Sequence, residues 1–531
     1  MTLLRPLTVL CSLLAATTLA KPLYKPRTQS IQWGPCDLPS LNTRPIECGS
    51  ILVPLDYTNP FSNETLKLAL IKSPAVVPLS PKKSILFNFG GPGYEAMQTL
   101  NGIADTLHNM TGGRHDLIAF DPRGTANTLR FTCFANQTER TLANAKYPLL
   151  AASSEGDLTR IVANSHAVSN LCAEAHAPND LTTRPSIPTL IGTSFVARDL
   201  MQVVDALGED GLLRFWGISY GSLLGATAAA MFPARISRLV LDGVVNAHNY
   251  YHHAGVDITQ LLSTDSAFRA ILASCLSAGP SRCALASLNS TSAADLEKTL
   301  LDLAESFSRQ PLVTSNPTGI ITKSLLLELY FIIVKYPSGV IPTAFSLFYD
   351  LLQDRTDHPE RVNNLYNALQ GSVSTGDNDA LLGILCADKG YDKVATSADD
   401  IREDFTAMRE TTALFGDIAG AVVTMCAGWK FRAKERFQGF ATDVTATTKK
   451  IKTKEAAVLF VGNTYDPVTP VVSAKNMSGW FEGSVVLERN GFGHASIAQR
   501  SDCTTGIFRE YFVNGTLPRQ GTVCEVDESL F

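Results

Sequence analysis

The chain has 531 residues, which exceeds one ordinary domain, so we expect a large core with an inserted or second lobe. A hydrophobic content of 45% and a charged content of 18% describe a globular protein and exclude a disordered one. The formal net charge of −5 at pH 7 leaves no basic excess, so we expect no nucleic-acid partner.

The first residues are typical of a secretory signal peptide. Arg5 gives a positive charge, residues 7–16 form an apolar run, and Ala20 ends a group of small residues suited to cleavage. The run is too short for a membrane span, which needs roughly 20 apolar residues. We therefore expect residues 1–20 to be removed and the mature protein to be secreted, without a membrane partner. Six glycosylation sequons fit this route, at Asn63, Asn109, Asn136, Asn289, Asn476 and Asn514.

Ten cysteines remain after that cleavage. An even number in an exported chain predicts five disulfides, although the sequence alone leaves the pairing open. Metal binding is the alternative, but no Cys-x-x-Cys pair or Cys/His cluster with ligand spacing occurs. The cysteines fall in five local couples, and we expect consecutive pairing. The expected disulfides are Cys36–Cys48, Cys133–Cys172, Cys275–Cys283, Cys386–Cys426 and Cys503–Cys524.

The first half of the mature chain alternates between strands and helices. Several apolar runs are continuous, which is typical of parallel strands buried on both faces. A helix is predicted over 194–208, capped by Ser194, and residues 131–190 are predicted to be a helical excursion. The predicted strands, in chain order, cover residues 48–57, 66–76, 84–89, 116–120, 213–216 and 237–245.

This alternation stops after residue 245. The next 200 residues show helical patterns, including an apolar helix at 325–336. Strands are predicted again at 456–464 and 484–488, so the sheet has received an insertion. The expected organisation is a signal peptide at 1–20, a core in two parts at 21–245 and 451–531, and a helical cap at 246–450.

The segment 217–221, Gly-Ile-Ser-Tyr-Gly, lies between a predicted strand and a predicted helix. This layout is typical of a nucleophile elbow, in which a strained turn exposes the serine, here Ser219. A serine needs an imidazole to take its proton and an acid to hold that imidazole. Asp466 and His494 each follow a late strand, in the order Ser, Asp, His, so we predict a catalytic triad. Asp242, at the end of an earlier strand, is the alternative acid.

An oxyanion hole requires two N–H groups directed at one point. The first should be the backbone N–H of Tyr220, which directly follows the nucleophile. The second should come from the segment Gly-Gly-Pro-Gly at 90–93, and Gly91 is our choice because Pro92 has no N–H.

Several motifs of this chain occur together in one known family. They are Gly-Gly-Pro-Gly at 90–93, Asp-Pro-Arg-Gly at 121–124, the elbow at 215–221, Leu-Asp-Gly-Val at 241–244 and Asn-Thr-Tyr-Asp-Pro-Val-Thr-Pro at 463–470. With them the chain resembles the proline-iminopeptidase and tripeptidyl-aminopeptidase-like branch of the α/β-hydrolases, and residues 426–524 resemble the C-terminal domain of the latter. The resemblance implies an α/β-hydrolase fold, with a mostly parallel sheet, flanking helices and a helical cap. It also implies a serine hydrolase without cofactor that commonly releases short peptides or amino acids from free N-termini.

Two departures from that branch lie at the mouth of the predicted site. Phe89 stands where the branch usually has His or Pro, and Tyr94 and Glu95 replace residues that are often small. Three functions therefore remain open. They are a secreted exopeptidase, a secreted esterase, lactonase or tailoring hydrolase of a small molecule, and a non-catalytic binding protein, which the intact triad disfavours.

The cap at 246–450 should lie over the serine and exclude long polypeptides. The expected partner is therefore a small peptide or another small molecule. An exopeptidase also needs an anion to hold the ammonium group of its substrate, because an unpaired buried charge is unfavourable. Glu95 and Glu328 are the candidates for that anion.

Overall fold

A computed structural model describes most of the chain from residue 30 to residue 531. It leaves out residues 40, 147–154, 178–185, 254–257, 289, 316–317, 354–358, 374–377, 390–393, 417–423, 443 and 446–447. The predicted signal peptide at 1–20 and the sequon at Asn289 therefore lie outside the described residues.

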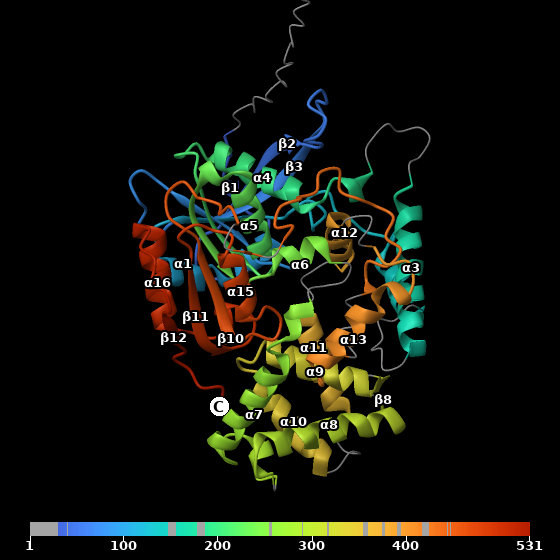
Figure 1. The fold of residues 1–531 in the computed structure, drawn as a ribbon. Helices are drawn as coiled ribbons and strands as arrows, with labels where there is room; N and C mark the ends of the chain where they lie inside the picture. The colour runs from blue at the N-terminus through green and yellow to red at the C-terminus, as the bar shows by residue number, and fades with distance from the viewer. Residues whose placement is uncertain are drawn as a thin grey trace, which may run out of the picture.

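One ten-stranded sheet organises the fold (Figure 1). Its strands lie in the order β1-β2-β3-β5-β4-β6-β7-β10-β11-β12. The pairs β1–β2, β2–β3 and β3–β5 are antiparallel, and every pair from β5–β4 onward is parallel. The strands are β1 (Gly34–Pro35), β2 (Glu47–Pro54), β3 (Thr65–Ser73), β4 (Ser84–Asn88), β5 (Asp116–Phe120), β6 (Leu213–Ile218), β7 (Ile236–Asp242), β10 (Leu459–Tyr465), β11 (Val485–Phe492) and β12 (Val523–Glu525).

Helices cover both faces of this sheet, as expected for continuous apolar strands. On β6, Phe215 packs in the cluster with helices α4 (Thr193–Leu207) and α5 (Tyr220–Met231). The next residue, Trp216, packs on the opposite face with α1 (Ala96–Thr111) and α16 (Asp502–Asn514). The predicted α/β class is therefore confirmed by the architecture.

One detail of the helix after residue 190 differs from the prediction. The N-cap of α4 is Gly192, whereas Ser194 is buried inside the first helical turn. A side chain at Gly192 would meet Ala433 at 2.5 Å, so close packing explains the glycine at this position.

The chain leaves the sheet after β7 and returns to it at β10. Helices α7 to α11 pack around a hydrophobic cluster of their own and gather at one end of the molecule (Figure 1). A short hairpin, β8 (Leu312–Ser315) and β9 (Thr318–Ile321), was not predicted. The helices of this insertion are α6 (Ala247–His252), α7 (Thr264–Ala278), α8 (Ala293–Arg309), α9 (Lys323–Lys335), α10 (Ile341–Gln353), α11 (Pro359–Val373), α12 (Asn378–Asp388) and α13 (Arg402–Thr411).

The two ends of the insertion pack on the core that surrounds the sheet. Tyr250 of α6, Leu385 of α12 and Trp429 belong to the same cluster as Phe215. Helix α3 (Glu155–Ala175), from the earlier excursion, packs through Leu158 against α13. The excursion also contains α2 (Gln137–Lys146). Packing therefore joins the insertion to the core at both ends and through α3.

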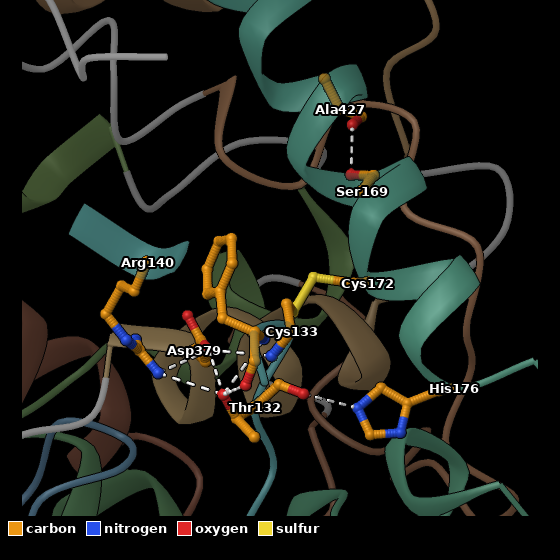
Figure 2. Close-up of a disulfide and its surroundings, with 9 residues drawn as sticks. Thr132, Cys133, Arg140, Ser169, Cys172, His176, Asp379 and Ala427 are labelled. Atoms are coloured by element: carbon orange, nitrogen blue, oxygen red, sulfur yellow. Dashed lines mark hydrogen bonds and ion pairs between the residues drawn. A yellow bond between two sulfur atoms is a disulfide. The ribbon is translucent and has the colours of Figure 1, made fainter. Parts of the chain in front are cut away.

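Five disulfides join the ten described cysteines in the consecutive pairs expected from the sequence. Figure 2 shows the Cys133–Cys172 bond, which ties α3 to the loop after β5. Beside it, Asp379 of α12 accepts hydrogen bonds from the backbone N–H of Cys133 (2.9 Å) and from Arg140 (2.8 Å). The disulfide thus closes the excursion itself, and the contacts of Asp379 fix the insertion to it.

Candidate active site

Ser219 occupies the turn between β6 and α5. Its φ of 58° is positive, a conformation that costs roughly 1–3 kcal/mol for a residue with a side chain. The flanking glycines permit the turn, because a Cβ at Gly217 would lie 2.0 Å from the carbonyl oxygen of Gly221. A Cβ at Gly221 would lie 2.3 Å from the carbonyl oxygen of Asn88. Local crowding therefore requires the Gly-x-Ser-x-Gly pattern at this elbow.

His494 and Asp466 lie together at the ends of β11 and β10. The Nδ1 atom of His494 is 3.1 Å from Oδ2 of Asp466 and 3.2 Å from Oδ1. Thr469 Oγ1 donates to Asp466 Oδ2 at 2.8 Å and lies 3.1 Å from the same histidine nitrogen. Burial raises the pKa of Asp466, but the charge and hydrogen bond of His494, with N–H bonds from Thr469 and Ala495, outweigh it and hold the pKa below its ordinary value. The site therefore keeps Asp466 ionised beside the imidazole.

Asp242, the alternative acid, has different partners. Its Oδ1 accepts the backbone N–H of Ser496 at 2.9 Å, and its Oδ2 accepts the Ser496 hydroxyl at 2.5 Å. The indole N–H of Trp216 lies 3.3 Å from Oδ2. Complete burial raises the pKa of Asp242. Asp242 therefore holds the loop after His494, while Asp466 contacts the imidazole itself.

Two residues that support this arrangement were missed in the sequence. Asn463 donates hydrogen bonds to the carbonyl oxygens of Gly493 and Ala495, both at 2.8 Å, and so clamps the histidine loop. Thr469 bridges the acid and the imidazole. Both stand in the motif at 463–470, but only the folded geometry assigns them partners.

The loop at 90–93 passes directly beside the nucleophile. A Cβ at Gly90 would lie 2.8 Å from the Cβ of Ser219, and Gly90 and Gly91 both have positive φ angles. The Gly90 N–H donates to Asn88 Oδ1 at 3.1 Å, which fixes the loop. Among the described residues, the N–H groups of Gly91 and Tyr220 have no acceptor, so both are free to bind an oxyanion.

The side chain of Tyr220 connects the elbow to the insertion. Its hydroxyl lies 2.6 Å from Thr193 Oγ1, which donates to Oδ2 of Asp388 at 2.5 Å. Tyr250 of α6 donates to the same oxygen at 3.1 Å. Burial raises the pKa of Asp388 to about 6, despite these hydrogen bonds.

This carboxyl group should make the stability of the protein depend on pH. The pKa of Asp388 is 3.8 in the unfolded chain and about 6 in the folded chain. The protonated carboxyl group therefore stabilises the fold fully below pH 3.8, and this stabilisation is lost as the pH rises through 6. A shift of this size corresponds to about 3 kcal/mol. Denaturant midpoints of the wild type and of Asp388→Asn should be measured from pH 4 to pH 8. The wild-type midpoint should fall relative to that of the variant as the pH rises, because asparagine does not ionise.

Asp302→Asn, at an exposed i,i+4 pair of α8, is the matched control and should follow the wild type. Because Asp121 also has a pKa raised to about 6 by burial, only the difference between variant and wild type isolates Asp388. Parallel pH curves for Asp388→Asn and the wild type would contradict this assignment.

Ser219 and His494 open into a cavity of about 730 Å³ between the core and the insertion. Phe89 and Tyr94, which depart from the family pattern, line it. The expected amine-binding acids do not: Glu95 is the half-buried N-cap of α1, and Glu328 lies on α9, one turn before the lining residue Phe331. The described lining residues also include Val245, Tyr250, Lys335, Tyr336, Leu385, Lys389 and Met425.

The insertion also touches the catalytic loops directly. The backbone N–H of His494 donates to the carbonyl oxygen of Lys335, the last residue of α9, at 2.9 Å. The Ser338 hydroxyl donates to the carbonyl oxygen of Ala498 at 2.5 Å. Tyr465 and Phe492 stack with ring centroids 4.8 Å apart and pack against the hydrophobic cluster of the insertion. His494 is therefore held from the insertion as well as from the sheet.

A mostly parallel sheet, a serine elbow and a buried Asp–His pair define the class of α/β-hydrolases that use a serine nucleophile. Family models support this class, since one described as alpha/beta hydrolase fold matches residues 83–278. Another, described as TAP-like protein, matches residues 412–524. The chain therefore has the α/β-hydrolase fold, matches the TAP-like model over residues 412–524, and is a serine hydrolase.

Curated relatives carry both peptidase and esterase names. The serine protease Hip1 of Mycobacterium tuberculosis is 25% identical over 519 residues, which cover 93% of this chain and 91% of that protein. The tripeptidyl aminopeptidase of Streptomyces lividans is 28% identical over 219 residues, 41% of this chain and 38% of that protein. Carboxylesterase B of Mycobacterium tuberculosis is 26% identical over 499 residues, 91% of this chain and 86% of that protein.

Proposed function

We propose that this protein is a secreted serine peptidase that releases short peptides or amino acids from the free N-termini of short chains. The observation that carries the proposal is the cavity of about 730 Å³ in front of Ser219 and His494. Pockets of roughly 300–1,000 Å³ hold ligands of drug-like size, which corresponds to a few residues rather than a long polypeptide. The names of the protease and aminopeptidase relatives support a peptide substrate.

The proposed mechanism uses an acyl-enzyme. Ser219 Oγ attacks the scissile carbonyl carbon while His494 takes the hydroxyl proton, and Asp466 holds the imidazole in the required tautomer. The carbonyl oxygen becomes an oxyanion that accepts the N–H groups of Gly91 and Tyr220. The C–N bond then breaks as His494 gives its proton to the leaving amine. Water, activated by the same histidine, hydrolyses the serine ester and restores the enzyme.

Secretion is part of the proposal. Five disulfides support an oxidising compartment, since such bonds are rare in reducing ones. The five described sequon asparagines are exposed, which supports glycosylation: they are Asn63, Asn109, Asn136, Asn476 and Asn514. Among the described residues, no helix has the length and apolar character of a membrane span.

A second function, the hydrolysis of carboxylic esters, is favoured by the cavity wall. None of the described residues that line the cavity is a carboxylate, so the wall shows no anion to hold a substrate ammonium group. The preference for a free N-terminus therefore rests on the named aminopeptidase relative. The carboxylesterase relative, which matches most of this chain, supports an ester substrate with the same triad.

A panel of substrates separates the two functions. We expect free-amine peptides of three to six residues to be cleaved near the N-terminus, and folded proteins to resist. N-acetylation should lower kcat/KM by about tenfold or more, the effect of one lost charge-assisted hydrogen bond. Mass spectrometry of the products, with short-chain esters run in parallel, gives the measurement. Equal cleavage of free and acetylated peptides, or internal cuts in a folded protein, would rule out the exopeptidase.

A further inference from the structure

Of the described residues, two lysines line the cavity, and their surroundings differ. Lys389 is only 1% exposed, and its ammonium donates to the backbone carbonyl oxygens of Tyr250 (2.7 Å) and His253 (3.2 Å). These bonds hold the start of the insertion to the end of α12. Lys389 therefore has a structural role in the cavity wall.

Lys335, by contrast, has no polar partner in the described part of the chain. Its ammonium makes no hydrogen bond and no ion pair there, and it lies 5.1 Å from the ring centroid of Tyr336. The side chain is half-buried at the cavity wall. A partly desolvated ammonium without an anion attracts one, because charge pairing recovers part of the lost hydration.

The position of Lys335 identifies the part of the substrate that it meets. Its carbonyl oxygen accepts the N–H of His494, so the two backbones adjoin, and both residues line the same cavity. In acyl transfer the histidine gives its proton to the leaving group, which therefore lies on the histidine side of the serine. The phenols of Tyr94 and Tyr336 hydrogen-bond each other in the same wall, and burial raises the pKa of both, so neither supplies a negative charge.

We propose that Lys335 binds a carboxylate on the leaving group and so makes the enzyme selective for substrates whose leaving portion is anionic. Where the substrate is a peptide, which rests on the function proposed above, this group is the free C-terminal carboxylate of a short chain or an acidic side chain just after the scissile bond. A free amino group is repelled from this side of the cavity and must enter on the acyl side.

Three matched peptides test the source of the carboxylate. They share one acyl portion and end as a free acid, as a C-terminal amide, or as an amide with Asp after the scissile bond. We expect the wild type to prefer a carboxylate-bearing peptide over the neutral amide by roughly 10- to 100-fold in kcat/KM, the range for a hydrogen bond to a charged group. The preferred peptide shows whether the carboxylate is terminal or belongs to a side chain.

An ester pair tests Lys335 without any peptide bond. The 4-carboxyphenyl and 4-carbamoylphenyl esters of one short fatty acid differ only in the charge of the leaving phenol. In the wild type the kcat/KM of the carboxyphenyl ester should exceed that of the carbamoylphenyl ester. Lys335→Met should abolish this preference for the charged leaving group, while Lys335→Arg should keep it. Lys452→Met removes a charge from an exposed surface pair and should keep the wild-type ratio. Comparing ratios between variants cancels the intrinsic reactivity of the phenols.

The outcomes separate the two proposals. If no peptide is cleaved but the ester preference exists and Lys335→Met abolishes it, the role of Lys335 stands and the peptidase function fails. If peptides are cleaved with equal kcat/KM for acid and amide forms, the peptidase stands and the role of Lys335 is overturned. That role is also overturned if Lys335→Met leaves the wild-type ratio unchanged in the ester pair.

Discussion

Replacing Ser219 with alanine should lower kcat/KM by about 10⁴-fold or more, and His494→Ala should do the same, because the triad acts as a unit. Alanine removes the hydroxyl that the strained turn at Ser219, with its φ of 58°, presents. Turnover of a short peptide and of a short-chain ester should fall together, and a fluorophosphonate probe should no longer label the protein.

The control for this pair is Ser266→Ala on α7, a serine whose hydroxyl donates to the carbonyl oxygen of Ser263 on the exposed surface. It should keep wild-type rates and labelling. Near-wild-type turnover by purified, folded Ser219→Ala protein would remove Ser219 from the mechanism.

Asp466→Asn is expected to lower kcat by about 10⁴-fold, because an amide next to Nδ1 favours the wrong imidazole tautomer. Asp242→Asn should leave catalysis within about tenfold of the wild type and instead lower the free energy of unfolding by about 1–3 kcal/mol, the effect of disturbing buried hydrogen bonds. Both aspartates are buried, Asp242 is the last residue of β7 and Asp466 directly follows β10, so this is a matched comparison. Turnover numbers and denaturant midpoints of the two variants give the measurement.

An opposite ranking, with Asp242→Asn the more damaging to kcat, would make Asp242 the acid of the triad. The structure argues against that result, since Asp242 contacts Ser496 and Trp216 and not the imidazole.

The central sheet could be predicted because its central strands contain continuous apolar runs. The segment predicted as 116–120 coincides with β5, and β4, β6 and β7 lie within a few residues of their predicted bounds. Parallel strands buried on both faces leave this pattern in any sequence. Ser219, Asp466 and His494 could be proposed because the fold fixes their order along the chain.

Contacts between distant segments could not be predicted. Hydrogen bonds from Tyr220 through Thr193 to Asp388 join three segments that are far apart in the sequence. Nothing in the sequence around Asp388, at the end of a helix, indicates these partners. For Glu95 and Glu328 the position in the sequence suggested the cavity, but neither residue is among those that line it. The hairpin β8–β9 is only four residues long in each strand, too short for a periodic signal.

The hydrogen bond from His494 to the end of α9 has a consequence for protein engineering. Cap segments are attractive units for exchange among α/β-hydrolases, because they shape the cavity without forming the sheet. Here a cap grafted from a relative would also replace three contacts with the histidine loop. They are the Lys335 carbonyl oxygen that accepts the His494 N–H, the packing of Pro337 beside Gly493, and the hydrogen bond from Ser338 to Ala498. A functional chimaera would therefore have to transfer residues 492–498 together with α9. The residues that set the specificity and the loop that carries His494 would then come from the same protein.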